Sequence, residues 1–472
     1  MLRPWEFQLT IEPDSAKPIY LQITDGIIDA IKQGKLKPKD MLPGSRLLGS
    51  QLKVNRNTVI QALEILLAEG WLMSKERRGT FVSNVLPEFL LNDQNREKEM
   101  LPQQKIEPLI KISFDDGLPD SRLAPLNELA RAYRQIFSRK GRWQMMGYSQ
   151  ESGDEDFKKA ITHMLNFKRT MGVSSSNIFI TRGSQMALYL TAQTLIQAKD
   201  IVVVENPGYK AAWDTFSMAG ATVVPIDVDD DGIKISVLKD LLLKGTKIKA
   251  VYVTPHHQFP TTVTLSLSRR LELISLSNLH GFIVIEDDYD HEFHFGPRPL
   301  MPLCSNGNLR NFVYIGTMSK IVAPALRIGY LTTTAENLQK ISVLRKMIDV
   351  QGDNIMEQAV LQLINDGEIK RHLKKASTKY KTKRDYLEFL ILKYLGGKVK
   401  YRRPEGGLAF WIQPINEFDL ETVADNLEKK GVRIVRSDNF GTDKPVRGLR
   451  LGFASLTEIQ LEEGIKALGE VL

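Results

Sequence analysis

The chain has very little cysteine and no long apolar segment. Cys304 is the single cysteine among 472 residues, so the sequence provides no disulfide framework and fits a reducing compartment. No run of about 18 apolar residues occurs, which predicts that no helix spans a membrane. The first residues also lack the apolar core of a signal peptide. We therefore expect a cytoplasmic protein.

The composition is that of a globular protein with a basic balance. Hydrophobic residues make up 42% of the chain and charged residues 25%, with a net charge of +8. Because domains usually hold about 100–200 residues, this length predicts more than one folding unit. The positive charge permits nucleic-acid binding without proving it. Residues 340–403 hold sixteen Lys/Arg against seven Asp/Glu, which indicates either a solvated helix face or a second DNA-facing surface.

Residues 10–85 read as a small helical domain that ends in a hairpin. Apolar spacing and turn signals predict helices over 19–33, 46–52 and 57–69, and a two-stranded wing over 71–82. We expect Ser45, after the Pro-Gly turn, to cap the second helix. The second and third helices, separated by a tight turn, have the spacing of a helix-turn-helix pair.

Four segments of this domain carry a family resemblance: Leu42-Pro-Gly-Ser-Arg46, Val54-Asn-Arg-Asn-Thr-Val59, Glu69-Gly-Trp-Leu72 and Arg78-Gly-Thr-Phe-Val82. Their order and spacing resemble the winged helix-turn-helix of the GntR family. The resemblance implies that the second helix of the pair enters the major groove and that the wing approaches the minor groove. It implies the following DNA-binding residues: Arg46, Arg56, Asn57, Thr58, Arg77, Arg78 and Gly79. The alternative is a helix-turn-helix that contacts protein.

A polar, aperiodic stretch over residues 86–110 predicts a linker, and residues 111–472 then alternate between strands and helices. The strand candidates are 178–181, 201–205, 222–226, 250–254, 282–286, 312–316 and 328–331. This alternation predicts an α/β fold with a mainly parallel sheet and helices on both faces. Ligands of such sheets bind at the carboxyl ends of strands, where several polar motifs of this chain follow.

The chemistry of these motifs indicates an aldehyde cofactor. Lys320 follows a strand among hydroxyl side chains and can form a Schiff base. Asp287, at another strand end, can pair with a protonated pyridine nitrogen. Gly183 and Ser184 open a helix, where backbone N–H groups suit a phosphate. Arg450, on a late strand, can clamp a carboxylate.

The order and spacing of the motifs resemble fold-type I aminotransferases over residues 111–472, and the whole chain resembles the MocR subfamily of GntR regulators. The first resemblance implies bound pyridoxal 5'-phosphate and a small C-terminal α+β subdomain. The cofactor-binding residues that it implies are the Schiff-base and catalytic Lys320, Asp287, Tyr289, Tyr209, Gly183, Ser184, Gln185, Thr317, Ser319, Arg327 and, from the partner subunit, Tyr148. Arg450 would bind the effector carboxylate. The sequence leaves open which of His256, His257 and Gln258 contacts the cofactor or effector.

The resemblance implies a homodimeric transcription regulator that binds double-stranded DNA at paired half-sites. Its large domain would sense pyridoxal phosphate, an amino compound, or both. The alternative is an active pyridoxal-phosphate-dependent aminotransferase with an accessory DNA-binding domain. A residual transamination half-reaction is compatible with both functions. We expect no metal site, because His291 and His294 are i, i+3 partners without an evident third ligand.

Overall fold

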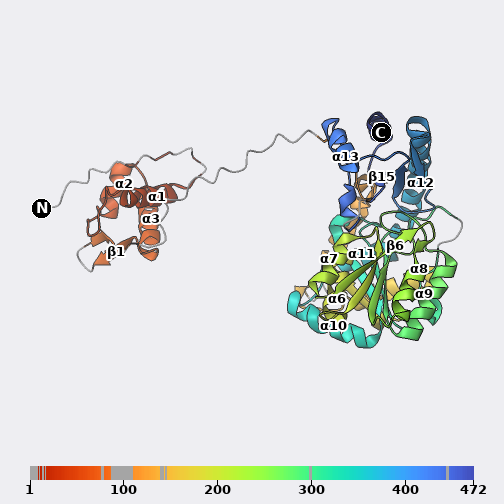
Figure 1. Ribbon diagram of the computed structural model, residues 1–472. Helices are drawn as coiled ribbons and strands as arrows, with labels where there is room; N and C mark the ends of the chain where they lie inside the picture. The colour runs from red at the N-terminus through yellow and green to blue at the C-terminus, as the bar shows by residue number, and fades with distance from the viewer. Residues whose placement is uncertain are drawn as a thin grey trace. The chain divides into compact units, whose positions relative to one another are not determined.

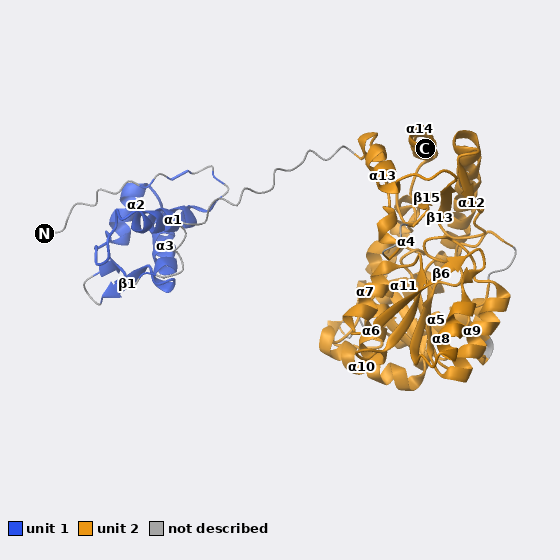
Figure 2. Ribbon diagram, in the orientation of Figure 1, with its two compact units in different colours: residues 1–107 blue, residues 108–472 orange. Residues whose placement is uncertain are grey.

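The computed structural model describes residues 17–75, 79–84, 110–138, 146–296, 300–442 and 446–472, with a few isolated positions between them. Figure 2 shows the two compact units into which the chain divides, residues 1–107 and 108–472. Nearly all of the expected linker lies outside the described residues. Among the described helices, none has the length and apolar character needed to cross a membrane.

The first unit is a three-helix domain with a hairpin. Its elements are α1 (Ile19–Lys32), α2 (Ser45–Leu52), α3 (Arg56–Ala68), β1 (Leu72–Lys75) and β2 (Gly79–Val82). Side chains from all three helices, among them Ile27, Leu48 and Leu66, are fully buried in one core. The predicted capping role of Ser45 is wrong, because Ser45 is the first residue of α2 and Gly44 is its N-cap.

The second unit is built on an eight-stranded sheet in the order β4-β11-β10-β9-β8-β5-β6-β7. The strands are β4 (Ile178–Thr181), β5 (Ile201–Asn206), β6 (Thr222–Asp229), β7 (Gly232–Ile233), β8 (Ile248–Val253), β9 (Ile283–Asp288), β10 (Phe312–Thr317) and β11 (Gly329–Thr333). All seven predicted strands are present. The central strands run parallel, whereas β11 is antiparallel to both of its neighbours.

Helices bury both faces of this sheet. Val202 and Val204 of β5 pack into one apolar cluster and Val203 into the other, because successive side chains of a strand point to opposite faces. Figure 1 shows α6, α7 and α10 on one side of the sheet and α8 and α9 on the other. The bounds of these helices are α6 (Ser184–Leu195), α7 (Lys210–Met218), α8 (Ile235–Leu243), α9 (Leu267–His280) and α10 (Ala335–Ile348). α5 (Glu155–Arg169) joins the second layer.

A smaller C-terminal subdomain completes the unit. It contains an antiparallel sheet in the order β12-β13-β15 and a parallel pair formed by β14 and β3. Its strands are β3 (Ile112–Phe114), β12 (Val399–Tyr401), β13 (Ala409–Pro414), β14 (Val432–Ile434) and β15 (Leu449–Gly452). The helices not yet named are α4 (Leu126–Ser138), α11 (Asn354–Asn365), α12 (Glu368–Leu395), α13 (Leu420–Lys429) and α14 (Glu458–Val471). The first strand of the second unit, β3, therefore pairs with β14, a strand close to the C-terminus of the chain.

Candidate functional site

A cavity of about 250 Å³ lies at the carboxyl ends of β8, β9 and β10. Eight of the residues predicted from the sequence line it: Ser184, Tyr209, Asp287, Tyr289, Thr317, Ser319, Lys320 and Arg327. They come from the ends of β9 and β10, the turns that follow, and the starts of α6 and α7. This is the edge at which open parallel sheets bind ligands.

Within the described structure, the amine of Lys320 is held at the cavity by one hydrogen bond. Its Nζ donates to the carbonyl oxygen of Gly117 over 2.6 Å. Gly117 lies in the turn that follows β3, and its φ of +103° is a conformation that glycine adopts without strain. The lysine from the middle of the chain and the first turn of the second unit therefore meet at the cavity.

The Asp287 carboxyl group is buried with one oxygen unpaired. The Tyr252 hydroxyl donates to Oδ2 over 2.9 Å, whereas Oδ1 has no hydrogen-bond partner among the described residues. Burial raises the pKa of Asp287 to about 7, because desolvation disfavours the charged carboxylate. A cationic group in the cavity would complete the bonding of Oδ1 and favour the ionised form.

The other end of the cavity suits a phosphate. Ser184 is the first residue of α6, a helix end with free N–H donors. Gly183 before it has φ +80°, and a Cβ there would lie 2.5 Å from Nη2 of Arg327, so glycine admits the guanidinium. The Ser319 Oγ is buried without a partner in the described structure. A dianion would satisfy these donors together.

Three aromatic rings form one wall. The Phe259 ring meets the Tyr209 ring edge-on at a centroid distance of 5.3 Å and the Tyr289 ring at 6.2 Å. Burial raises the pKa of Tyr209 to about 12. The Tyr289 hydroxyl donates to the carbonyl oxygen of His257 over 2.8 Å. The wall can therefore pack against a planar ligand while its hydroxyls remain neutral donors.

Arg450 is fully buried beside this wall and does not line the cavity. Its Nε donates to the Asp116 carbonyl over 2.8 Å and its Nη1 to the Pro260 carbonyl over 2.7 Å. Its guanidinium carbon stands 4.7 Å from the centre of the Phe259 ring. A carboxylate ligand would have to replace these carbonyl acceptors, so effector binding by Arg450 stays a prediction.

Several other predicted residues lie outside the cavity. Gln185 bonds to Thr215 and Tyr209 instead, and Tyr148 is 89% exposed. The His257 ring pairs with Asp290. His256 is buried in an ionic cluster, and Gln258 bonds to neighbouring backbone carbonyls. None of these three loop residues lines the cavity.

Six further residues line the cavity without having been assigned a role from the sequence: Asp116, Leu118, Tyr252, Thr254, Phe259 and Pro324. A usable signal existed only for Tyr252 and Thr254. They are two residues apart at the end of β8, and alternation places them on one face. Asp116 and Leu118 are far away in sequence and lack such a signal.

The buried ionic cluster lies on the opposite side of β9. Asp288 follows Asp287, so its side chain points away from the cavity. Its Oδ2 accepts from Arg169 over 2.5 Å and from the Tyr314 hydroxyl over 2.8 Å. The neighbouring guanidinium and histidines hold the pKa of Asp288 well below its usual range, against the opposing effect of desolvation. Asp288 and Arg169 therefore form a buried ion pair beneath the site.

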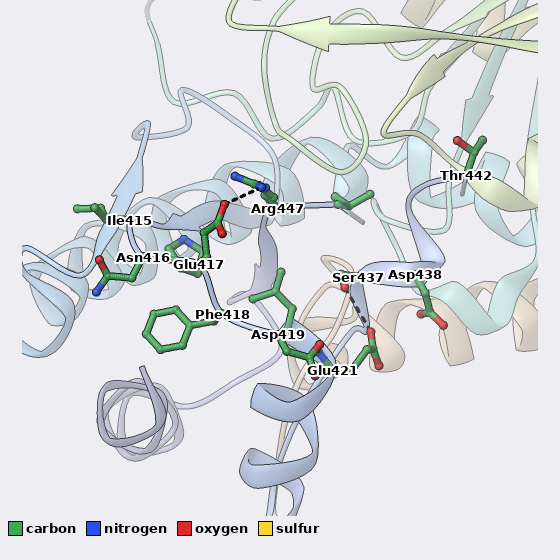
Figure 3. Close-up of a pocket in the computed structure, with 13 residues that line it drawn as sticks. Ile415, Asn416, Glu417, Phe418, Asp419, Glu421, Ser437, Asp438, Thr442 and Arg447 are labelled. Carbon is green, nitrogen blue, oxygen red and sulfur yellow. Dashed lines mark hydrogen bonds and ion pairs between the residues drawn. The ribbon is translucent and has the colours of Figure 1, made fainter. Parts of the chain in front are cut away.

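A larger hollow of about 630 Å³ lies on the C-terminal subdomain (Figure 3). Glu417 and Arg447 form an ion pair at its edge, and the Ser437 hydroxyl donates to Glu421. The hollow contains none of the predicted cofactor residues and no lysine, and it borders residues 443–445, which lie outside the described structure. The smaller cavity therefore remains the candidate site.

In the first unit, three of the predicted DNA-binding residues, Arg56, Asn57 and Thr58, lie at the start of α3. Arg56 and Asn57 are exposed, as is Arg46 on α2. The Asn55 side chain caps α3 by accepting from the Asn57 N–H over 2.9 Å. Gly79 begins β2 with φ +103°. Arg77 and Arg78 lie outside the described residues.

Comparison with known proteins agrees with this two-part plan. Residues 110–468 match the aminotransferase class I and II family, and the chain belongs to that family. Residues 19–82 match the gntR family of bacterial regulatory proteins. The fold is thus of the aminotransferase class, and the chain as a whole has the domain plan of MocR-type HTH regulators.

Individual relatives show the same division. The probable rhizopine catabolism regulatory protein MocR of Rhizobium meliloti is 26% identical over 98% of this chain and 95% of its own length. Aromatic-amino-acid aminotransferase 1 of Thermococcus litoralis is 28% identical over 76% of this chain and 88% of its own. The crystal structure of Pyrococcus horikoshii kynurenine aminotransferase superposes with a TM-score of 0.71 and 30% identity, covering 77% of this chain and 90% of that one.

The substitution Asp287→Asn should separate cofactor affinity from fold stability. The folded-state pKa of about 7 lies above the ordinary value of 3.8, so ionisation destabilises the cofactor-free fold as pH rises from about 4 to 7. We expect cofactor-free Asp287→Asn to melt a few degrees above wild type at pH 8 and at nearly the same temperature at pH 4. Pyridoxal phosphate affinity should fall about tenfold or more, because a charge-assisted bond contributes about 1.5–3 kcal/mol. Thermal melts and cofactor titrations measure the two effects, and equal cofactor affinity would contradict the role of Asp287.

Proposed function

We propose that the protein is a DNA-binding transcription regulator whose aminotransferase-like unit binds pyridoxal phosphate through Lys320 and senses the cofactor, an amino compound, or both. The main support for this proposal is that the unpaired Oδ1 of Asp287 lies in the same cavity as the Lys320 amine. The same chain also contains a domain that matches the gntR family of bacterial regulatory proteins. A cofactor with an aldehyde and a basic ring nitrogen matches this donor and acceptor set.

The side chains present fit this cofactor. When bound, pyridoxal phosphate supplies an aldehyde that reacts with amines and a ring that withdraws electrons. Lys320 would supply the nucleophilic amine, and Asp287 would hold the proton on the ring nitrogen. Ser184, Ser319 and Arg327 would bind the phosphate, with Gly183 and Thr317 supporting them: the Thr317 Oγ1 accepts the Ser319 N–H over 3.1 Å.

We further propose that the protein acts as a homodimer. Trp143, Met146 and Tyr148 expose 71%, 61% and 89% of their side chains in one short segment. Glu151 ties the end of this segment to α10, on which Met347 is 76% exposed. An apolar surface of this kind fits burial against a second copy. Tyr148 would then contact the cofactor phosphate bound by the partner subunit. The two DNA-binding domains of the dimer would bind paired half-sites.

A second candidate function is an active aminotransferase with an accessory DNA-binding unit. The complete lining set around Lys320 and Asp287 supports it, since nothing in that set distinguishes sensing from turnover. Steady-state transamination with a panel of amino donors and keto acids separates the two. Sustained turnover far above that of Lys320→Ala would favour the enzyme.

The regulator proposal predicts that occupancy of the cavity changes DNA affinity. Wild-type protein should bind a duplex taken from upstream of its own gene, with an affinity that changes when pyridoxal phosphate, alone or with amino compounds, is added. Arg56→Ala should weaken binding by about 1–3 kcal/mol and leave cofactor uptake unchanged. Fluorescence anisotropy measures the affinity. If DNA affinity stays the same on addition of cofactor and of amines, the proposed sensing is refuted.

A further inference from the structure

The first half of α12 carries an exposed surface of one charge. The α12 basic face consists of Lys370, Arg371, Lys374, Lys375, Lys379 and Lys381, all exposed. No acidic residue occurs from 369 to 384. At about 1.5 Å per residue, the six side chains extend over about 16 Å of helix. At about 100° per residue, these side chains spread over about half of the helix circumference, on the side opposite the buried residues.

The charges of this face are largely uncompensated. Arg371 pairs with Glu368, but the five lysines form no ion pair within the described part of the chain. The later basic residues of the same helix behave differently: Lys383 pairs with Asp120, Arg384 with Asp385 and Lys393 with Glu462. Free positive charge is therefore concentrated on the first half of the helix.

The stability of the helix does not account for these lysines. Like charges four residues apart, such as Lys370 with Lys374, destabilise a helix by about 0.2–0.5 kcal/mol per pair. Cations near the start of a helix also oppose its dipole. The face opposite, with buried Leu373, Ala376 and Tyr380, anchors α12 in the core. Figure 2 shows α12 beside α14, with which it packs. The lysines therefore stand on a rigid support and suit an external anion.

We propose that the α12 basic face is a second DNA-contact surface, which binds the phosphate backbone of the duplex without reading its bases. Duplex DNA presents one negative charge per about 1.7 Å of axis, or about nine along 16 Å, so phosphates are available for each of the five unpaired lysines. Lysine is a point-charge donor and suits phosphate contacts that carry no sequence information. This inference rests on the proposed function, because it requires that the helix-turn-helix domain bring the chain to DNA.

The test compares two full-length variants that lose the same charge. One carries Lys374→Gln, Lys375→Gln and Lys379→Gln on the face, and the control carries Lys199→Gln, Lys244→Gln and Lys247→Gln at exposed sites elsewhere on the unit. The probe is a labelled random-sequence duplex of about 60 base pairs, titrated from about 50 to 200 mM KCl. The plot of log affinity against log salt should lose about 0.9 of slope per contacting lysine in the first variant. The control should keep the wild-type slope.

The outcomes separate this inference from the proposed function. If wild type binds no duplex at all, the proposed function fails. If wild type binds and the α12 variant keeps the wild-type slope and affinity, only the second surface is overturned. Arg56→Ala should add its own loss to that of the α12 variant, because the two sites are independent. Loss of binding to phosphatidylserine vesicles with unchanged DNA binding would assign the face to a membrane and overturn the inference.

Discussion

Replacing Lys320 with alanine should remove the bound cofactor's visible absorption entirely. Purified wild type, loaded with pyridoxal phosphate, should absorb at about 410–430 nm, a property of the cofactor when joined to an amine. Among the residues that line the cavity, Lys320 is the sole lysine, so no other lining amine can take its place. Among the described residues its one hydrogen-bond partner is a backbone carbonyl, so we expect the variant to fold normally.

Borohydride reduction followed by mass spectrometry measures the same effect independently. Wild type should carry the added mass on the peptide that contains residue 320, and Lys320→Ala should carry none. Lys210→Ala is the matched control, because Lys210 is exposed and follows Tyr209 of the cavity wall. A wild-type protein that stays colourless and unmodified with excess cofactor would refute the cofactor assignment.

The second large effect is on stability. Asp288→Ala should lower the free energy of unfolding by about 3–5 kcal/mol, because it leaves the buried Arg169 guanidinium without its carboxylate. The same substitution removes the acceptor of the Tyr314 hydroxyl. Asp156→Ala is a suitable control, since its ion pair with Lys159 is exposed to solvent and should contribute little to stability. Urea unfolding followed by tryptophan fluorescence measures both.

The pH dependence of the stability lost in Asp288→Ala follows from the lowered pKa of Asp288. A carboxyl group whose folded pKa lies below its unfolded value of 3.8 stabilises the fold above that value and loses the contribution as pH falls through the folded pKa. The difference between wild type and Asp288→Ala should therefore be constant from about pH 5 to 8 and shrink only in stronger acid. A deficit that disappears near neutral pH would show that Asp288 is not the ionised partner.

The central sheet could be predicted because each strand carries its own signal. The apolar run of β5 is buried on both faces and is visible without knowledge of its neighbours. β3 is different. Its three residues form a strand only because Ile112 pairs with Val432, more than three hundred residues later. Short strands of this kind depend on tertiary pairing, which local pattern does not encode.

The candidate site likewise contains residues that the sequence could predict and contacts that it could not. Asp287 and Lys320 could be found because their residue types are chemically distinctive and follow recognisable strands. The acceptors that hold Lys320 and Arg450 are backbone carbonyls, which every residue has, so no sequence pattern marks them. Ser45 failed as a cap because a turn signal fixes a helix start only to within a residue or two.

The turn after β3 connects the chemistry of Lys320 with the start of the second unit. The Gly117 carbonyl accepts from the Lys320 amine, and the Asp116 carbonyl beside it accepts from Arg450. Covalent attachment of an aldehyde to this amine would leave at most one N–H donor on Nζ, which would weaken or redirect its bond to the Gly117 carbonyl. We therefore expect the turn after β3 to change position when the Lys320 nitrogen is covalently occupied.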